Sequence, residues 1–234
     1  MTSAADSASR NAERRRPYEM SGHFGLWLTV TAGAYALLHH IGSLPDGLGH
    51  PPGSATRWVD WLDLLVPYLV LMPALAALTT AGAAVSRTMW LLFAVGAVAY
   101  ASGHGIHLAA NSVVNAVADS VGPTPAAVAD TAHLWDERVG HLVWYAGAAL
   151  VMAALALVLL QRPPVRAWWP YALALAVGVT WATNAVGGGI ALLGFGAAVT
   201  FVAVGWKQRA TQGRLLAVAF APAVVLIPLL YALS

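Results

Sequence analysis

Long apolar stretches separated by short polar connections dominate the pattern of this chain. Seven of them approach or exceed the roughly 20 residues that a helix needs to cross the hydrocarbon core of a bilayer. They cover residues 22–42, 61–82, 88–117, 129–161, 166–185, 188–206 and 214–233. The third and fourth are longer than one span and are expected to project beyond the hydrocarbon. The pattern predicts an all-α fold, a polytopic membrane helix bundle of about seven transmembrane helices.

The segment before the first apolar stretch has a different character. It is polar and carries three consecutive arginines, Arg14, Arg15 and Arg16. The apolar run that follows, 22–42, is longer than the 7–15 residues typical of a secretory signal, so we expect a retained first span. We therefore predict a disordered basic cytoplasmic tail over residues 1–20 and a single transmembrane helical domain over 21–234.

Composition supports the membrane assignment. Hydrophobic residues make up 59% of the chain and charged residues 9%, whereas soluble domains carry roughly 25% charged residues. The formal net charge of +2 is too small to favour a nucleic-acid partner. The sequence has no cysteine, which excludes disulfides and thiolate ligands.

Basic residues fall in alternate connections between the apolar stretches. On the side of the N-terminal tail these are Arg87, Arg162, Arg166, Lys207, Arg209 and Arg214, whereas the opposite connections hold only Arg57. Cytoplasmic loops carry an excess of Lys and Arg. The distribution predicts a multi-pass protein of the cell membrane with a cytoplasmic N-terminus and an extracytoplasmic C-terminus.

The ionisable residues of the apolar stretches are confined to the first four. All eight histidines precede residue 142, and no acidic residue follows Glu137. At about 1.5 Å per residue, several of them lie at one level, roughly 26–31 Å above the cytoplasmic edge. The histidines at that level are His39, His104, His107 and His141, and Asp60 and Asp63 open the second stretch on the same side. Ionisable groups inside a membrane are costly and point to function.

Helical angles place the polar residues of the third and fourth stretches in one stripe on each helix. On the third stretch the stripe is about 80° wide and contains Tyr100, His104, His107, Asn111 and Asn115. On the fourth, His133, Glu137 and His141 follow i, i+4, i+8, with Asp136 beside them. Gly140 shares this stripe and should let another helix come close. We expect the two stripes to face each other.

These residue types favour a metal site. Imidazole and carboxylate groups suit zinc or iron, and copper is possible. We predict the ligands His104, His107, His133, Glu137 and His141, with Asp136 and Glu137 as catalytic residues. Residues that orient these ligands or bind the metal in addition to them are expected among His39, His40, Asp60, Asp63, Asn111 and Tyr100.

Structural roles remain alternatives for some of these side chains. Asp60 and Asp63 could cap the second helix. Asn111 and Asn115 could hydrogen-bond between helices. The whole cluster could be a buried hydrogen-bond network that holds four helices together.

The leading functional hypothesis is a membrane metalloenzyme acting on a lipid or another hydrophobic small molecule. Hydrolysis by a metal-activated water is slightly favoured over oxidation, and Asp136 or Glu137 would handle the proton. Transport of protons or metal ions is an alternative, although the cytoplasmic halves of the spans offer almost no ionisable residue. Haem binding by facing histidines is another, although it leaves the carboxylates unexplained.

Seven spans with a cluster of His and Asp residues resemble the superfamily of alkaline ceramidases and progestin/adipoQ receptors. Its members are zinc-dependent membrane amide hydrolases or their relatives. That superfamily carries a His-x-x-x-His pair in its last span, whereas this chain has no histidine after His141. The resemblance therefore concerns architecture and chemistry, implies no membership, and favours hydrolysis.

Overall fold

The computed structural model describes residues 22–44 and 48–233, and the predicted basic tail lies outside this part. The described part is all-α, as predicted. Its α-helices are α2 (Gly22–Leu38), α3 (Trp58–Asp63), α4 (Val66–Ala81), α5 (Arg87–Val121), α6 (Ala126–His133), α7 (His141–Leu159), α8 (Trp169–Gly187), α9 (Ala191–Lys207) and α10 (Gly213–Leu233). Short 3-10 turns cover Ile41–Ser43 and Gly82–Ala84, and a π-helical segment, η4, covers Leu134–Gly140.

Four helical stretches are long and apolar enough to cross a membrane. They are Trp58–Ala84, Arg87–Ala118, Ala126–Leu159 and Gly213–Leu233. Two shorter apolar helices, His23–Leu38 and Ala191–Lys207, accompany them. These stretches indicate a multi-pass membrane protein, while the count of seven spans stays a prediction.

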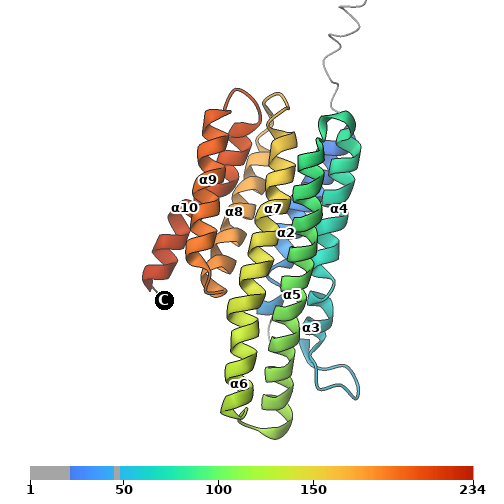
Figure 1. Cartoon of the computed structure of the whole chain (residues 1–234), viewed down its shortest axis with the longest axis vertical. Coiled ribbons are helices and arrows are strands. Elements are labelled where there is room, and N and C mark those ends of the chain that lie inside the picture. Colours follow the sequence, from blue (N-terminus) through green and yellow to red (C-terminus); the bar gives the residue numbers. More distant parts are fainter. Residues whose placement is uncertain (1–21, 45–47, 234) are drawn as a thin grey trace, which may run out of the picture.

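The helices form an elongated bundle (Figure 1). α2 and α4 pack together at one side, α8, α9 and α10 at the other, and α5 and α7 pair along the middle. α5 has 35 residues and a length of about 52 Å, well above the roughly 30 Å of hydrocarbon. The lower end of α5 therefore projects with α6 beyond the other helices, as expected for the two long stretches.

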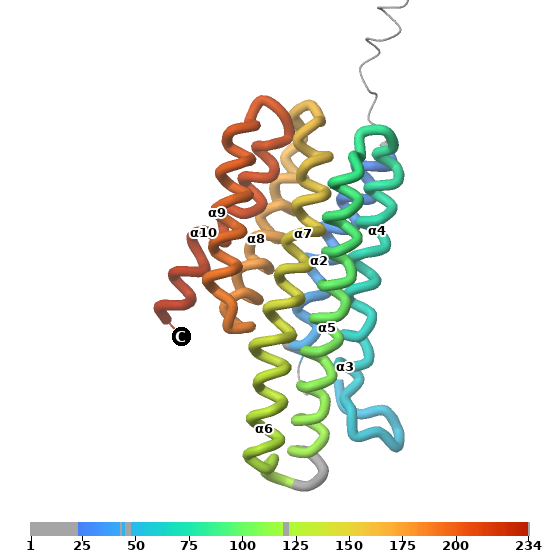
Figure 2. The backbone as a smooth tube through the Cα atoms, in the orientation of Figure 1, coloured from blue at the N-terminus to red at the C-terminus, as the bar shows by residue number. Residues whose placement is uncertain are grey.

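The connections are sorted between the two ends of the bundle. Figure 2 shows those between α4 and α5, α7 and α8, and α9 and α10 at the same end. These carry the basic residues that the sequence places on the side of the N-terminal tail. The helix directions thus agree with the predicted alternation, and the direction of the bundle across a membrane remains a prediction.

Glycines allow α5 and α7 to pack in backbone contact. A Cβ on Gly103 would lie 2.1 Å from the backbone nitrogen of Trp144, and one on Gly147 would lie 2.2 Å from that of Tyr100. Small residues at such crossings are typical of helix pairs in membranes. Gly140 behaves as expected, because its Cβ would lie 2.9 Å from the backbone nitrogen of His107. The contacts hold the polar stripe of α5 against the start of α7.

The segment before α7 corrects one expectation. The predicted stripe of His133, Glu137 and His141 assumes a continuous α-helix, whereas Leu134–Gly140 is π-helical. The backbone N–H of His141 donates to the carbonyl of Asp136, five residues earlier. In a π turn the backbone hydrogen bond joins residues i and i+5 rather than i and i+4. The Asp136 carboxylate lies with His107 and His141, and Oε2 of Glu137 stays 3.8 Å from Nδ1 of His141.

Candidate metal centre

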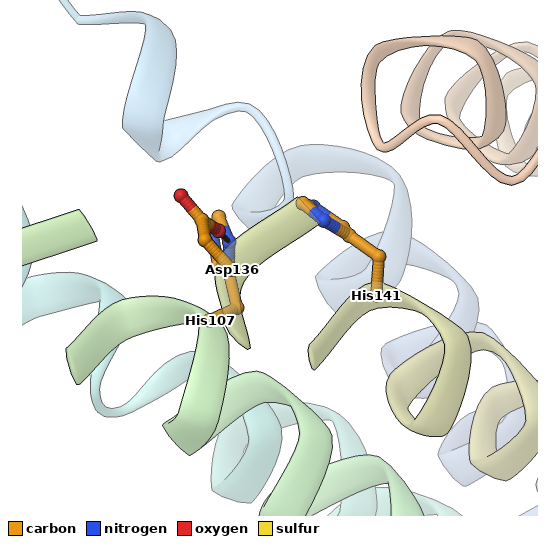
Figure 3. Close-up of side chains that lie close together, drawn as sticks. All are labelled: His107, Asp136 and His141. Atoms are coloured by element: carbon orange, nitrogen blue, oxygen red, sulfur yellow. Dashed lines mark hydrogen bonds and ion pairs between the residues drawn. The ribbon is translucent and has the colours of Figure 1, made fainter. Parts of the chain in front are cut away.

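Three side chains from two helical rods converge at the junction of η4 and α7. They are His107 of α5, Asp136 of η4 and His141, the first residue of α7 (Figure 3). One potential ligand atom from each lies within 4.8 Å of the others. Metal–nitrogen and metal–oxygen bonds are about 2.0–2.2 Å, so a small side-chain movement brings all three atoms onto one ion. We call these residues the His–Asp–His cluster.

Backbone geometry accounts for the direction of each side chain. The glycine contacts between α5 and α7 bring His107 against His141, with ring centroids 4.5 Å apart. The π turn brings Asp136 to the same place, and its carboxylate accepts a hydrogen bond from Nδ1 of His107. A carboxylate that binds one imidazole nitrogen fixes the ring and leaves Nε2 as the free lone pair.

His141 has a buried ring nitrogen without a partner. Its side chain is 9% exposed, and its Nδ1 is buried without a hydrogen-bond partner. The nearest carboxylate oxygen, Oε2 of Glu137, is 3.8 Å away, which is too far for a hydrogen bond. Buried polar atoms are normally satisfied, and an unsatisfied one suggests an ion or other ligand. The cluster thus fits a cation by chemistry as well as by position.

The charges around the cluster also favour a bound cation. Within the described residues, Asp136 pairs with His107, and Asp63 pairs with His104. Neither carboxylate forms an ion pair with a lysine or arginine in that part of the chain, and Arg57 is engaged by Asp60. Carboxylates inside a bundle need compensating positive charge, which a divalent cation supplies.

The indole of Trp144 lies at the centre of four histidine rings. Ring centroids of four histidines lie 4.8–5.7 Å from that of Trp144. These are His39, His104, His107 and His141, and the rings of His39 and His141 stack on the indole. Trp144 is therefore the wall shared by all four rings. From the sequence alone, its spacing from His141 indicates only that both lie on one face of the helix.

His104, a predicted ligand, is directed elsewhere. Its Nε2 lies 3.0 Å from the carbonyl oxygen and 3.3 Å from the carboxylate of Asp63. Both atoms can only accept, so Nε2 carries the proton. Nδ1 is then a bare lone pair, buried and without a hydrogen-bond partner. His104 thus ties α5 to α3 and lies outside the His–Asp–His cluster.

His39 and His40 are engaged by neighbouring helices. Nδ1 of His39 donates to the carbonyl of Tyr35 at 2.9 Å, which leaves Nε2 to accept from the hydroxyl of Tyr100 at 2.6 Å. Nε2 of His40 lies 3.1 Å from Oγ1 of Thr180 on α8. The ring nitrogens that face other helices are therefore already paired.

The remaining predicted site residues lie further out. His133 is exposed at the end of α6. Asp60 bonds Arg57 at 2.8 Å and caps α3, which is the structural alternative considered for it. The amide of Asn115 donates to Asn111 at 3.0 Å along α5. None of these side chains belongs to the His–Asp–His cluster in the described part of the chain.

The turn between α8 and α9 also contacts the cluster. A Cβ on Gly188 would lie 2.6 Å from Cδ2 of His141, so this glycine packs directly on the His141 ring. The run of three glycines marks a turn, but only the packing of α8 against α7 shows which side chain it meets.

Comparisons with known proteins add no family. Neither family models, nor curated proteins, nor solved structures show a significant match to this chain.

Proposed function

We propose that this protein is an integral membrane metalloprotein that holds one divalent transition metal at His107, Asp136 and His141. The observation that carries the proposal is the convergence of these side chains, together with the unpartnered buried Nδ1 of His141. Zinc and iron suit two imidazoles and a carboxylate, and copper is a further candidate.

We infer in addition that the metal serves catalysis. Two histidines and one carboxylate leave coordination positions open, as in hydrolytic zinc sites and non-haem iron sites. Zinc would supply Lewis acidity and an activated water, whereas iron or copper would support oxidation. We favour hydrolysis.

Asp136 and Glu137 then have different roles at this centre. Asp136 orients the His107 ring through Nδ1 with one oxygen, which leaves its second oxygen for the metal. The side chain of Glu137 is 35% exposed and lies one turn from His141, where it can exchange a proton with water.

The surroundings favour a lipid or another hydrophobic molecule as the substrate. The cluster lies between apolar helices, and the side chains of His107 and Asp136 are 19% and 16% exposed. A molecule dissolved in the bilayer reaches such a site without crossing a large polar surface.

The test of the enzymatic proposal is a product analysis. Purified protein loaded with zinc or with iron is incubated with a total lipid extract in detergent, and the products are identified by mass spectrometry. We expect free fatty acids, or oxygenated lipids for an oxidative enzyme, from the native chain and none from His107→Ala. Identical product profiles for the two proteins with both metals would refute an enzymatic role.

A further inference from the structure

Arg162, in the turn after α7, is a buried cation without an anionic partner in the described part of the chain. It is 5% exposed, and its Nε is buried without a hydrogen-bond partner. The ion pairs of residues 22–44 and 48–233 involve Arg57 and three histidines, and none involves Arg162. An arginine stays charged in proteins, and burying a charge costs free energy unless an opposite charge compensates it. An anion is therefore the partner that this guanidinium lacks.

No acidic residue of the described part lies at this end of the bundle. Those residues belong to α3, α6, η4 and the last turn of α5, at the opposite end (Figure 1). Around Arg162 the charged residues are basic instead. Arg166, in the same connection, and Arg214, at the start of α10, are both exposed. This end of the bundle is therefore positive and attracts anions from outside the chain.

Three helices meet at Arg162. Its Cζ lies over the ring of Phe24 at the start of α2, 5.0 Å from the ring centroid. Its backbone N–H donates to the carbonyl of Leu159, the last residue of α7, at 3.0 Å, and its carbonyl accepts from the N–H of Gln212 at 3.1 Å. The carbonyl of Gln212 accepts in turn from the N–H of Leu216 on α10 at 3.3 Å. These contacts fix Arg162 between the basic ends of α2, α7 and α10.

An apolar cavity of about 160 Å³ begins at the same contacts. Leu159 and Leu216 line it, and so does Leu28, which is one turn after Phe24 on α2. From Leu159 the cavity follows α7 as far as Ala148, roughly 16 Å away. Its basic end is therefore bounded by residues that are hydrogen-bonded to Arg162 or Gln212, or lie one turn from the ring under the guanidinium.

The walls of this cavity favour hydrocarbon. They are almost entirely apolar, and the hydroxyls of Thr29 and Thr31 donate to carbonyls of their own helix. The hydroxyl of Tyr100, at the far end, bonds His39. An apolar space of this kind holds no water without polar partners, whereas a hydrocarbon chain needs none. The cavity and Arg162 together match a molecule with an apolar chain and an anionic end.

We propose that an anionic amphiphile binds here, with its oxyanion head group at Arg162 and a hydrocarbon chain in the cavity. Phosphate and carboxylate share the required chemistry, because both present oxygens that a guanidinium can bind in pairs. A membrane lipid is the source that we expect, since the basic end faces the anionic cytoplasmic leaflet in the predicted orientation. The inference is independent of the metal centre, which lies toward the opposite end of the bundle.

Isothermal titration calorimetry of the purified protein in maltoside micelles tests the site with three probes. Dodecyl phosphate carries both the chain and the anion, dodecanol carries the chain, and inorganic phosphate carries the anion. The native chain should bind dodecyl phosphate at least about tenfold more tightly than dodecanol, the scale of hydrogen bonds to a charged group. Inorganic phosphate should bind at least about a hundredfold more weakly than dodecyl phosphate, because each buried methylene contributes about fourfold.

The head-group end is tested by changing the two arginines of one connection. Arg162→Gln removes the buried charge and should weaken dodecyl phosphate at least about tenfold while leaving dodecanol unchanged. Arg166→Gln, at an exposed position, is the matched control and should bind both probes as the native chain does. If Arg162→Gln does not fold, Arg162→Lys, which loses the paired geometry of the guanidinium, should weaken dodecyl phosphate and spare dodecanol.

The chain end is tested on α8. Ala174→Leu extends a side chain from the cavity wall, whereas Ala176→Leu adds the same group on the exposed face. Ala174→Leu should weaken dodecyl phosphate and dodecanol alike, at least about tenfold, because it displaces several methylenes. Ala176→Leu should change neither.

Three results would overturn the amphiphile site. The first is equal binding of dodecyl phosphate and dodecanol by the native chain, and the second is inorganic phosphate binding as tightly as dodecyl phosphate, which indicates a site for free phosphate. The third is native-like binding by both Arg162→Gln and Ala174→Leu. Glu19, which lies outside the described residues, is the alternative anion within the chain. A preference for dodecyl phosphate that appears only in Glu19→Gln would assign Arg162 to that carboxylate and also overturn the site.

Discussion

An imidazole buried among membrane helices has two ring nitrogens to satisfy, and the histidines of this bundle do so in different ways. His39 uses both in hydrogen bonds, and His104 uses one, toward Asp63. His107 gives one nitrogen to Asp136, and His141 has an unpartnered Nδ1. His107 and His141 are thus the best ligand candidates, because each keeps a ring nitrogen for an ion and both converge with Asp136.

This difference predicts which substitutions spare the metal. His104→Leu should retain the metal and lower the free energy of unfolding by about 1 kcal/mol, the scale of an interhelical hydrogen bond in a membrane. His133→Ala, at an exposed position, should retain both metal and stability. Elemental analysis and thermal denaturation of the purified variants measure both quantities. Loss of metal from either variant would restore that residue to the ligand set.

Much of the residue-level picture is present in the sequence. Depth and helical angle select His107 and His141 as ligands and bring Asp136 beside them as a catalytic residue, because both quantities follow from helix geometry. They favour Glu137 over Asp136 as the carboxylate ligand and place His104 with His107 in the ligand set. The choice among these depends on a π turn and on Asp63 of α3, which no periodicity of a single helix specifies.

At the level of elements, the close pairing of α5 and α7 positions the centre. A methyl group on Gly103 meets the backbone of Trp144, which cannot move aside as a flexible side chain would. Gly105, two residues further, has no neighbouring heavy atom within 4 Å of the same position. The two glycines therefore provide a matched pair.

Gly103→Ala is expected to push the helices apart. We predict a loss of at least about 2 kcal/mol in the free energy of unfolding, the range of an overpacked core, and a fall in metal content. Gly105→Ala should be neutral or stabilising by up to about 1 kcal/mol, because alanine is the better helix former. Thermal denaturation followed by circular dichroism compares them. Equal stabilities would contradict the close pairing.

The helices themselves could be predicted from the sequence, and their irregularities could not. Apolar length locates every long helix to within a few residues, because the bilayer fixes that length. The π-helical segment Leu134–Gly140 depends on how α6 and α7 dock on α5, with Gly140 against the backbone of His107. Such segments occur frequently at functional sites, which agrees with the place of this one.

For the whole molecule, the basic connections at one end of the bundle predict its orientation across the membrane. If the basic end faces the cytoplasm, the metal centre lies toward the extracytoplasmic end, beside the projecting hairpin of α5 and α6. The position would give the centre access to the outer leaflet.

The absence of cysteine from the sequence makes this orientation directly measurable. A cysteine at Ala126, exposed at the start of α6, should react with a membrane-impermeant maleimide on intact cells. A cysteine at Ala210, exposed between α9 and α10, should react only after permeabilisation. The reverse pattern would invert the topology, and labelling of both sites on intact cells would contradict a spanning bundle.

The central claim is that His107, Asp136 and His141 hold a metal ion, and elemental analysis of the purified native chain tests it most directly. We predict about one zinc, iron or copper ion per chain, and loss of that ion from His141→Ala while the exposed variant His23→Ala keeps it. No stoichiometric transition metal in the native chain, or equal metal in His141→Ala, would contradict the account.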